Sequence, residues 1–171
     1  MACEIISVEG AVFALWGQPT KADLDRVIDR VELIASATGR PIIYITRVPT
    51  AAPPPADAVR QHLNSLMPRF IKACSSYHVL LEGSGFVSAL KRGILASLLQ
   101  LGWRNGTFFV HENEKGVLSK VERAYRANVE AILTLAGTKG LLTAPPPEEA
   151  SVATAARQSN RAARNASPPL R

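Results

Sequence analysis

The amino-acid sequence predicts one α/β domain: an N-terminal β-hairpin followed by successive βα units, in a mostly parallel sheet packed with helices. Four apolar runs of strand length support this prediction, at residues 12–16, 41–45, 78–81 and 107–110. A segment with helical periodicity follows each run. Strands that alternate with helices are typical of consecutive parallel strands, which bring the polar residues that follow them to one edge of the sheet.

The hairpin and the first helix have the clearest local signals. Strand-like runs at 4–8 and 11–16 flank Gly10, and a glycine there supplies the positive φ that a tight turn needs. Thr20 can cap the helix that follows, with Asp23 at the position of the capping-box acid. Glycine and proline then predict the end of this helix near residue 39.

The second βα unit contains a conflict between two local signals. The run 41–45 reads as a central parallel strand, and residues 47–55 read as a proline-rich loop. A helix with apolar residues on one side is expected from about Asp57. Because a proline inside a helix removes a hydrogen bond and costs about 3 kcal/mol, Pro68 predicts a kink or a break near Leu66.

The remaining elements follow the same alternation. A strand is expected at 77–81, a helix at 86–101 and the last strand at 107–110. A final helix is expected after Asn113, with an apolar stripe that includes Val117, Val121, Tyr125 and Ile132.

Length and composition indicate one domain with an appended tail. Of 171 residues, 47% are hydrophobic and 20% are charged, values typical of a globular chain. The boundary is expected near residue 140, with the domain at 1–140. Residues 141–171, rich in Pro, Ala and Arg, have little apolar surface and are expected to be a disordered tail.

Charge and cysteine content restrict the compartment and the partners. The net charge is +6, but the basic residues are scattered among acidic ones or lie in the tail, so no specific nucleic-acid partner is expected. Two cysteines do not form a disulfide framework, and the N-terminus lacks the pattern of a signal peptide. We therefore expect a cytoplasmic protein without a transmembrane helix, although contact with a membrane surface stays open.

The order of elements resembles the STAS fold, the family of the bacterial anti-sigma-factor antagonists, and especially its SpoIIAA-like branch. The resemblance covers residues 5–135. Its most similar stretches are Tyr-His-Val-Leu-Leu-Glu-Gly at 77–83, Lys-Arg-Gly-Ile-Leu at 91–95 and Phe-Phe-Val at 108–110. The resemblance implies a sheet of βα units and a role in regulation through protein contacts.

The family's regulatory members carry a phosphorylatable serine in an Asp-Ser-Ser-Gly-like motif where their second helix begins. This chain has Thr-Ala-Ala-Pro-Pro-Pro at residues 50–55 in that place. The resemblance therefore carries no phosphorylation site over to this chain, and Thr50 is interpreted as an ordinary loop residue.

Polar residues after the predicted strands form the first candidate site, because ligands of open α/β sheets bind beyond the carboxyl ends of the strands. The run from Glu82 to Gly85 joins a strand to a helix, where free N–H groups can hold an anion. An ordinary helix cap at Ser84 or Gly85 is the alternative that we favour, and no residue is assigned as catalytic. The expected ligand-binding residues are Arg47, Glu82, Gly83, Ser84, Gly85 and His111.

The three histidines do not predict a metal site. His62, His78 and His111 lie on different elements, and no two share the spacing of helical metal ligands. We interpret His78 as a hydrogen-bonded, partly buried side chain, and we expect neither a metal nor a cofactor.

The predicted helix at 86–101 is the candidate interaction surface. Besides its inward stripe it has a second apolar flank, which makes it wider in apolar surface than packing on one sheet requires. Burial under a neighbouring helix is the alternative. The expected interface residues are Lys91, Arg92, Leu95, Leu99 and Trp103.

Together these features favour a non-enzymatic interaction or regulatory module of STAS-like type, with a protein partner or self-association. The alternative is a protein that binds a small ligand or an anion, or a hydrolase, built around the turn at residues 82–85.

Overall fold

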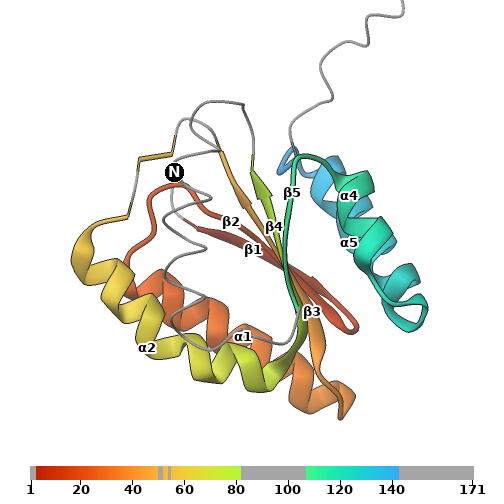
Figure 1. Ribbon diagram of the computed structural model, residues 1–171, viewed down its shortest axis with the longest axis horizontal. Helices are drawn as coiled ribbons and strands as arrows, with labels where there is room; N and C mark the ends of the chain where they lie inside the picture. Colours follow the sequence, from red (N-terminus) through yellow and green to blue (C-terminus); the bar gives the residue numbers. More distant parts are fainter. Residues whose placement is uncertain (1–2, 50–51, 54, 82–106, 143–171) are drawn as a thin grey trace, which may run out of the picture.

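The computed structural model describes residues 3–49, 52–53, 55–81 and 107–142 of the chain. A five-stranded sheet forms its centre, seen nearly edge-on in Figure 1, and its strands follow one another in sequence order. The strands are β1 (Glu4–Val8), β2 (Ala11–Leu15), β3 (Ile42–Val48), β4 (Cys74–Leu81) and β5 (Phe108–His111). The described helices are α1 (Lys21–Thr38), α2 (Asp57–Ala73), α4 (Glu114–Lys120), the 3₁₀ turn η1 (Arg123–Tyr125) and α5 (Arg126–Thr138).

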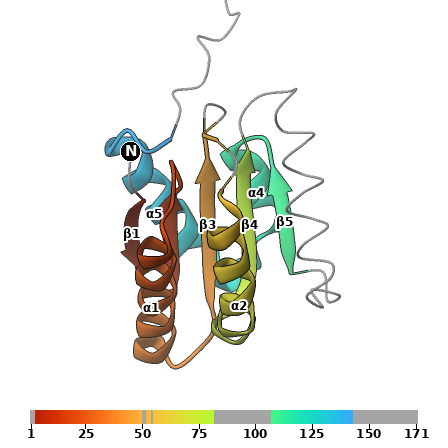
Figure 2. The same cartoon turned by 90° about the vertical axis from the view of Figure 1, so that its left-hand side faces the viewer.

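The sheet is mixed and is covered on both faces. β1 pairs antiparallel with β2, whereas β2 to β5 run parallel. Because parallel crossovers are right-handed, strands that follow one another in order place their connecting helices on one face. α1 and α2 lie together on that face, and α4 and α5 cover the opposite face (Figure 2). The predicted α/β class is therefore confirmed.

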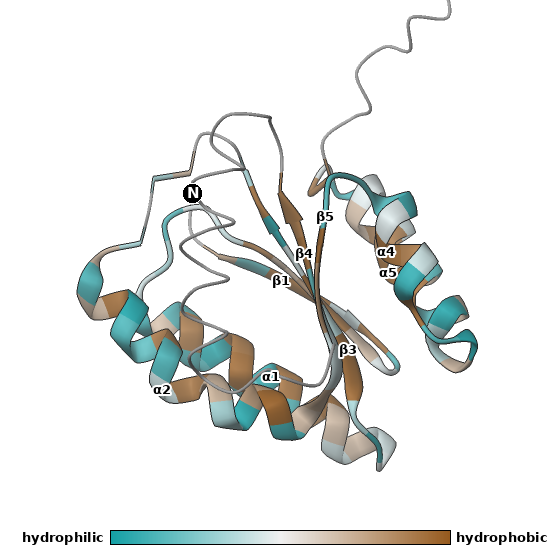
Figure 3. Cartoon of the chain, viewed as in Figure 1, coloured by the Kyte–Doolittle hydropathy of each residue, from teal (hydrophilic) through white to brown (hydrophobic). Residues whose placement is uncertain are grey.

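Alternation along each strand divides the core into two halves. Val12, Tyr44 and Val79 face α1 and α2, whereas Phe13 and Ile45 face α4 and α5. β2 and the first four residues of β3 are apolar and buried on both faces, as expected of parallel strands between two helical layers, and the brown colour of the sheet in Figure 3 reflects this composition.

The predictions for the hairpin and the first helix are confirmed in detail. Gly10, in the β1–β2 turn, has φ +70°, and a Cβ there would lie 2.7 Å from Asn128 Nδ2 of α5. The Thr20 side chain accepts from the Asp23 backbone N–H, and the Asp23 side chain accepts from the Thr20 backbone N–H, which completes the capping box. Gly39 ends α1 in the left-handed conformation.

Of the kink or break expected near Leu66, the break does not occur, because α2 continues through Pro68. Pro68 is exposed, whereas Met67 and Phe70 beside it are buried in the core. Packing of this buried side fixes the helix more strongly than the lost hydrogen bond weakens it. β3 also extends to Val48, so Arg47 belongs to a strand rather than to the predicted loop.

The final helical segment is divided, contrary to the single helix expected from its apolar stripe. α4 ends at Lys120, and extended backbone at Val121 and Glu122 leads into η1 and α5. The Tyr125 hydroxyl donates to the Pro41 carbonyl across 2.9 Å and fixes the break against the start of β3. A local apolar stripe could not reveal this contact between distant residues.

The described residues include no helix that is both long and apolar enough to cross a membrane. The predicted helix at 86–101 and most of the predicted tail lie outside the described residues.

Candidate functional site

A row of polar side chains crosses β4 and β5 on the face that α4 and α5 cover. Ser76 and His78 alternate along β4, and Thr107, Phe109 and His111 alternate where β5 begins and continues. Side chains two residues apart in a strand share a face, so Ser76 and His78 point to the same side of the sheet as Phe109 and His111. A hydroxyl group and two imidazoles are thereby brought together.

Three of these side chains form a hydrogen-bonded chain, here called the Ser76–His78–His111 chain. Ser76 Oγ lies 2.8 Å from His78 Nε2, and His78 Nδ1 lies 2.9 Å from His111 Nε2. The His78 ring lies within 24° of parallel to Phe109, its direct neighbour in register, and within 16° of parallel to His111, with ring centroids 5.1 Å apart in each case. Both ring nitrogens of His78 are satisfied although its side chain is fully buried.

Burial keeps the two imidazoles neutral. Loss of hydration lowers the pKa of His78 to about 3, with a further contribution from His111. Burial, followed by the positive charge of Lys120, also lowers the pKa of His111. A neutral imidazole has one donor and one acceptor nitrogen, so the Ser76–His78–His111 chain can run in either direction. Ser76 correspondingly either donates to His78 or accepts from it.

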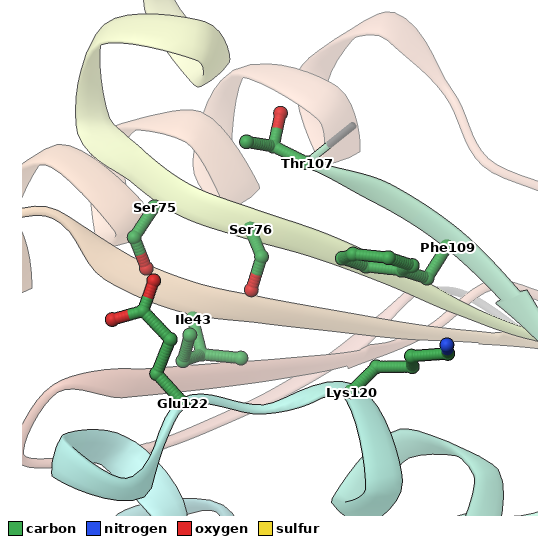
Figure 4. A pocket seen from close by; sticks show the side chains of 7 residues that line it. All are labelled: Ile43, Ser75, Ser76, Thr107, Phe109, Lys120 and Glu122. Carbon is green, nitrogen blue, oxygen red and sulfur yellow. The ribbon is translucent and has the colours of Figure 1, made fainter. Parts of the chain in front are cut away.

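A small cavity of about 90 Å³ opens beside Ser76, at the amino ends of β4 and β5 (Figure 4). We call it the Ser76 pocket. Its walls come from the starts of three strands and from the break between α4 and η1. The lining residues are Ile43, Ser75, Ser76, Thr107, Phe109, Lys120 and Glu122.

An irregularity in the sheet places the Ser75 hydroxyl in this pocket. The pairing of β3 with β4 shifts between Ile42 and Ile43, so that Ser75 is an extra residue on β4. Bulges of this kind redirect a side chain that regular alternation would send to the other face. The Ser75 hydroxyl donates to the Ile42 carbonyl across 3.3 Å, and its oxygen lines the Ser76 pocket.

The arrangement suits binding better than nucleophilic catalysis. A serine beside a histidine that contacts a third polar group has the connectivity of a catalytic triad. A general base is effective when its pKa lies near the working pH. The depressed pKa of His78 makes it a weak base at neutral pH. The Ser76–His78–His111 chain is therefore suited to presenting Ser76 Oγ at the pocket as a hydrogen-bonding group.

Two of the predicted ligand-binding residues, Arg47 and His111, are among the described residues. They lie in one row of the sheet, with Leu80 of β4 between them. Both are largely buried, and their side chains make structural contacts: the Arg47 guanidinium donates to the Leu141 carbonyl, and His111 bonds to His78. His78 itself is fully rather than partly buried. The hydroxyl of Thr46, next to Arg47, donates to the Ala14 carbonyl.

The other predicted site residues lie outside the described residues. These are the turn Glu82, Gly83, Ser84 and Gly85, and the interface residues Lys91, Arg92, Leu95, Leu99 and Trp103.

Sequence reasoning missed the Ser76 pocket because it searched only the carboxyl ends of the strands. One available signal was the spacing of Ser76 and His78, which puts both side chains on one face of a strand. The Ser75 bulge and the approach of Lys120 and Glu122 depend on pairing and on a helix break, which leave no local pattern.

Within the described ranges, no group of three or more His, Cys, Asp or Glu side chains is arranged to hold a metal ion. Comparisons with protein-family models, curated proteins and solved structures find no match.

Proposed function

We propose that the chain is a non-enzymatic regulatory module of STAS-like type that acts by binding a protein partner or a second copy of itself. The observation that carries the proposal is the architecture: a hairpin, then parallel strands in sequence order with α1 and α2 on one face. This arrangement agrees with the STAS resemblance of the sequence.

The chemistry of the described residues supports a binding role. Arg47 and His111, the polar residues at the carboxyl ends of β3 and β5, are engaged inside the protein, where they stabilise packing. His78 is a poor base at neutral pH because burial depresses its pKa. A module that acts through its surface requires neither residue as a catalyst.

The interface proposed for this function is the apolar flank at Leu95, Leu99 and Trp103. The test compares Leu99→Glu with a matched control, Leu33→Glu on α1, whose leucine is 57% exposed in the folded chain. Leu99→Glu places one acid on the helix predicted at 86–101, and Leu33→Glu places one acid on α1. Circular dichroism checks that each variant folds, and sedimentation gives its mass in solution. Immobilised full-length protein captures a binding partner, which is then purified and titrated into the wild type and each variant.

We expect wild type and Leu33→Glu to self-associate or to bind the purified partner equally, and Leu99→Glu to remain folded with binding weakened at least about tenfold. A wild-type protein that stays monomeric and binds no purified partner would overturn the proposal. Unchanged binding by Leu99→Glu, or its unfolding, would reject the proposed interface.

A further inference from the structure

The Ser76 pocket lies at the amino ends of β4 and β5, and the proposed regulatory function leaves it without a role. Its dimensions limit what it can hold. Because a cavity must offer at least about 10–15 Å³ to hold one water, a volume of about 90 Å³ has room for a few waters or for a ligand of a few non-hydrogen atoms.

Two opposite charges border this space. Figure 4 shows the Glu122 carboxylate beside Ser75 at one end of the pocket, and the Lys120 side chain extending below Phe109 towards the other end. The extended backbone at Val121 and Glu122 explains the arrangement, since residues two apart in extended chain point to one side, with Cα atoms about 7 Å apart. Val121, between them, packs against the core.

The neutral groups complement each charged end. Near Glu122, the Ser75 hydroxyl gives its proton to the Ile42 carbonyl, which leaves oxygen lone pairs to accept from a ligand. In the middle, Ser76 can donate or accept according to the direction of its bond with His78. Ile43 and Phe109 supply apolar contact for a short aliphatic group.

We propose that the Ser76 pocket binds a small α-amino acid as its zwitterion, with the ammonium group at Glu122 and Ser75 and the carboxylate at Lys120. A simple anion would also face the Glu122 carboxylate, and a simple cation would face the Lys120 ammonium group. Only a ligand that carries both charges is matched at both ends. The volume of about 90 Å³ matches glycine, alanine or serine, and a larger side chain would have to extend out of the pocket.

The test is calorimetric titration of the full-length protein with glycine, L-alanine and L-serine. Acetate lacks the ammonium group, methylamine lacks the carboxylate, and L-phenylalanine exceeds the volume of the pocket. All three serve as comparison ligands at equal ionic strength. Because both charged residues are exposed, we expect a Kd on the order of 1 mM for the best small amino acid. Acetate and methylamine should bind at least about tenfold more weakly, since each loses a charge-assisted contact.

Lys120→Gln and Glu122→Gln should each weaken amino-acid binding at least about tenfold, and Lys115→Gln, an exposed position on α4 outside the pocket, should leave it unchanged. All three changes are at exposed positions, and circular dichroism confirms that each variant folds. The proposal is overturned by any of three results: no saturable binding up to about 50 mM, equal affinity for acetate, or unchanged binding in both charge variants.

Discussion

At the scale of single residues, His78 is the group on which the polar interior depends. It is fully buried, it bonds to Ser76 and His111 through its two ring nitrogens, and its ring lies beside those of Phe109 and His111 on β5. A buried polar group that keeps all its partners contributes modestly to stability, whereas one that loses a partner is strongly destabilising. A substitution of Ser76 or His111, the two ends of the Ser76–His78–His111 chain, should therefore leave His78 without a partner and destabilise the fold.

Ser76→Ala should lower the free energy of unfolding by about 1–3 kcal/mol, because it leaves the buried His78 Nε2 without its hydroxyl partner. Ser75→Ala is the matched control on the adjacent residue, whose hydroxyl makes only a 3.3 Å bond to a carbonyl. Urea denaturation of both variants gives the comparison. An equal or larger loss for Ser75→Ala would show that Ser76 does not support His78.

His78 should also make stability depend on pH in the acid range. Its pKa is about 3 in the folded chain and near 6.5 when unfolded, so below pH 6.5 the unfolded chain binds the extra proton. Stability should therefore fall as the pH is lowered from 6.5, by about 1.4 kcal/mol per pH unit from this residue. Denaturation of wild type and His78→Phe at several pH values should show a flatter acid slope for the variant. Equal pH dependence of stability in wild type and His78→Phe would contradict the assignment of the acid destabilisation to His78.

At the scale of elements, the most predictable parts of the fold were those with local chemistry. The capping box of Thr20 and Asp23, the turn at Gly10 and the end of α1 at Gly39 are each encoded within a few residues. The continuity of α2 through Pro68 and the break after Lys120 were not predicted, because burial of Phe70 and the bond from Tyr125 to Pro41 come from distant parts of the chain.

The candidate site follows the same division. Sequence reasoning expected Arg47 and His111 near the carboxyl edge of the sheet, and both lie in one row there, with Leu80 between them. It did not foresee that the two side chains are largely buried and bonded inside the protein. The Ser76 pocket requires the bulge at Ser75, and strand register cannot be read from one strand alone.

Thr20→Ala tests the best-defined local element. Loss of the capping hydroxyl leaves the Asp23 backbone N–H without its acceptor and should lower stability by about 1 kcal/mol. Thermal unfolding measures the effect, and Thr20→Ser is the control that restores the cap. If the serine variant is as unstable as the alanine variant, the hydroxyl does not act as a cap.

At the scale of the whole molecule, two helical layers hold one sheet, and a few polar contacts fix the layers to it. Arg47 is the longest-range example, since its guanidinium joins β3 to the carbonyl of Leu141, 94 residues later in the chain. The residue chosen from the sequence as a ligand-binding cation thus connects the sheet to the segment after α5.

Arg47→Met should lower the free energy of unfolding by about 2–3 kcal/mol, because it keeps the aliphatic stem but leaves the Leu141 carbonyl without this charged donor. Arg126→Met, on the exposed side of α5, provides the control and should change stability by less than about 0.5 kcal/mol. Chemical denaturation distinguishes them. A fully stable Arg47→Met protein would return Arg47 to the role of a binding residue.

The proposed binding role depends on a Ser76–His78–His111 chain that is neutral at neutral pH. The most direct test is an NMR titration of the imidazole nitrogens of His78 and His111 in the full-length protein. We predict that the His78 nitrogens keep the shifts of one neutral tautomer from pH 8 down to about pH 5, since the pKa of His78 is about 3. Titration of His78 near pH 6.5 to 7 would contradict the account and give Ser76 an effective general base.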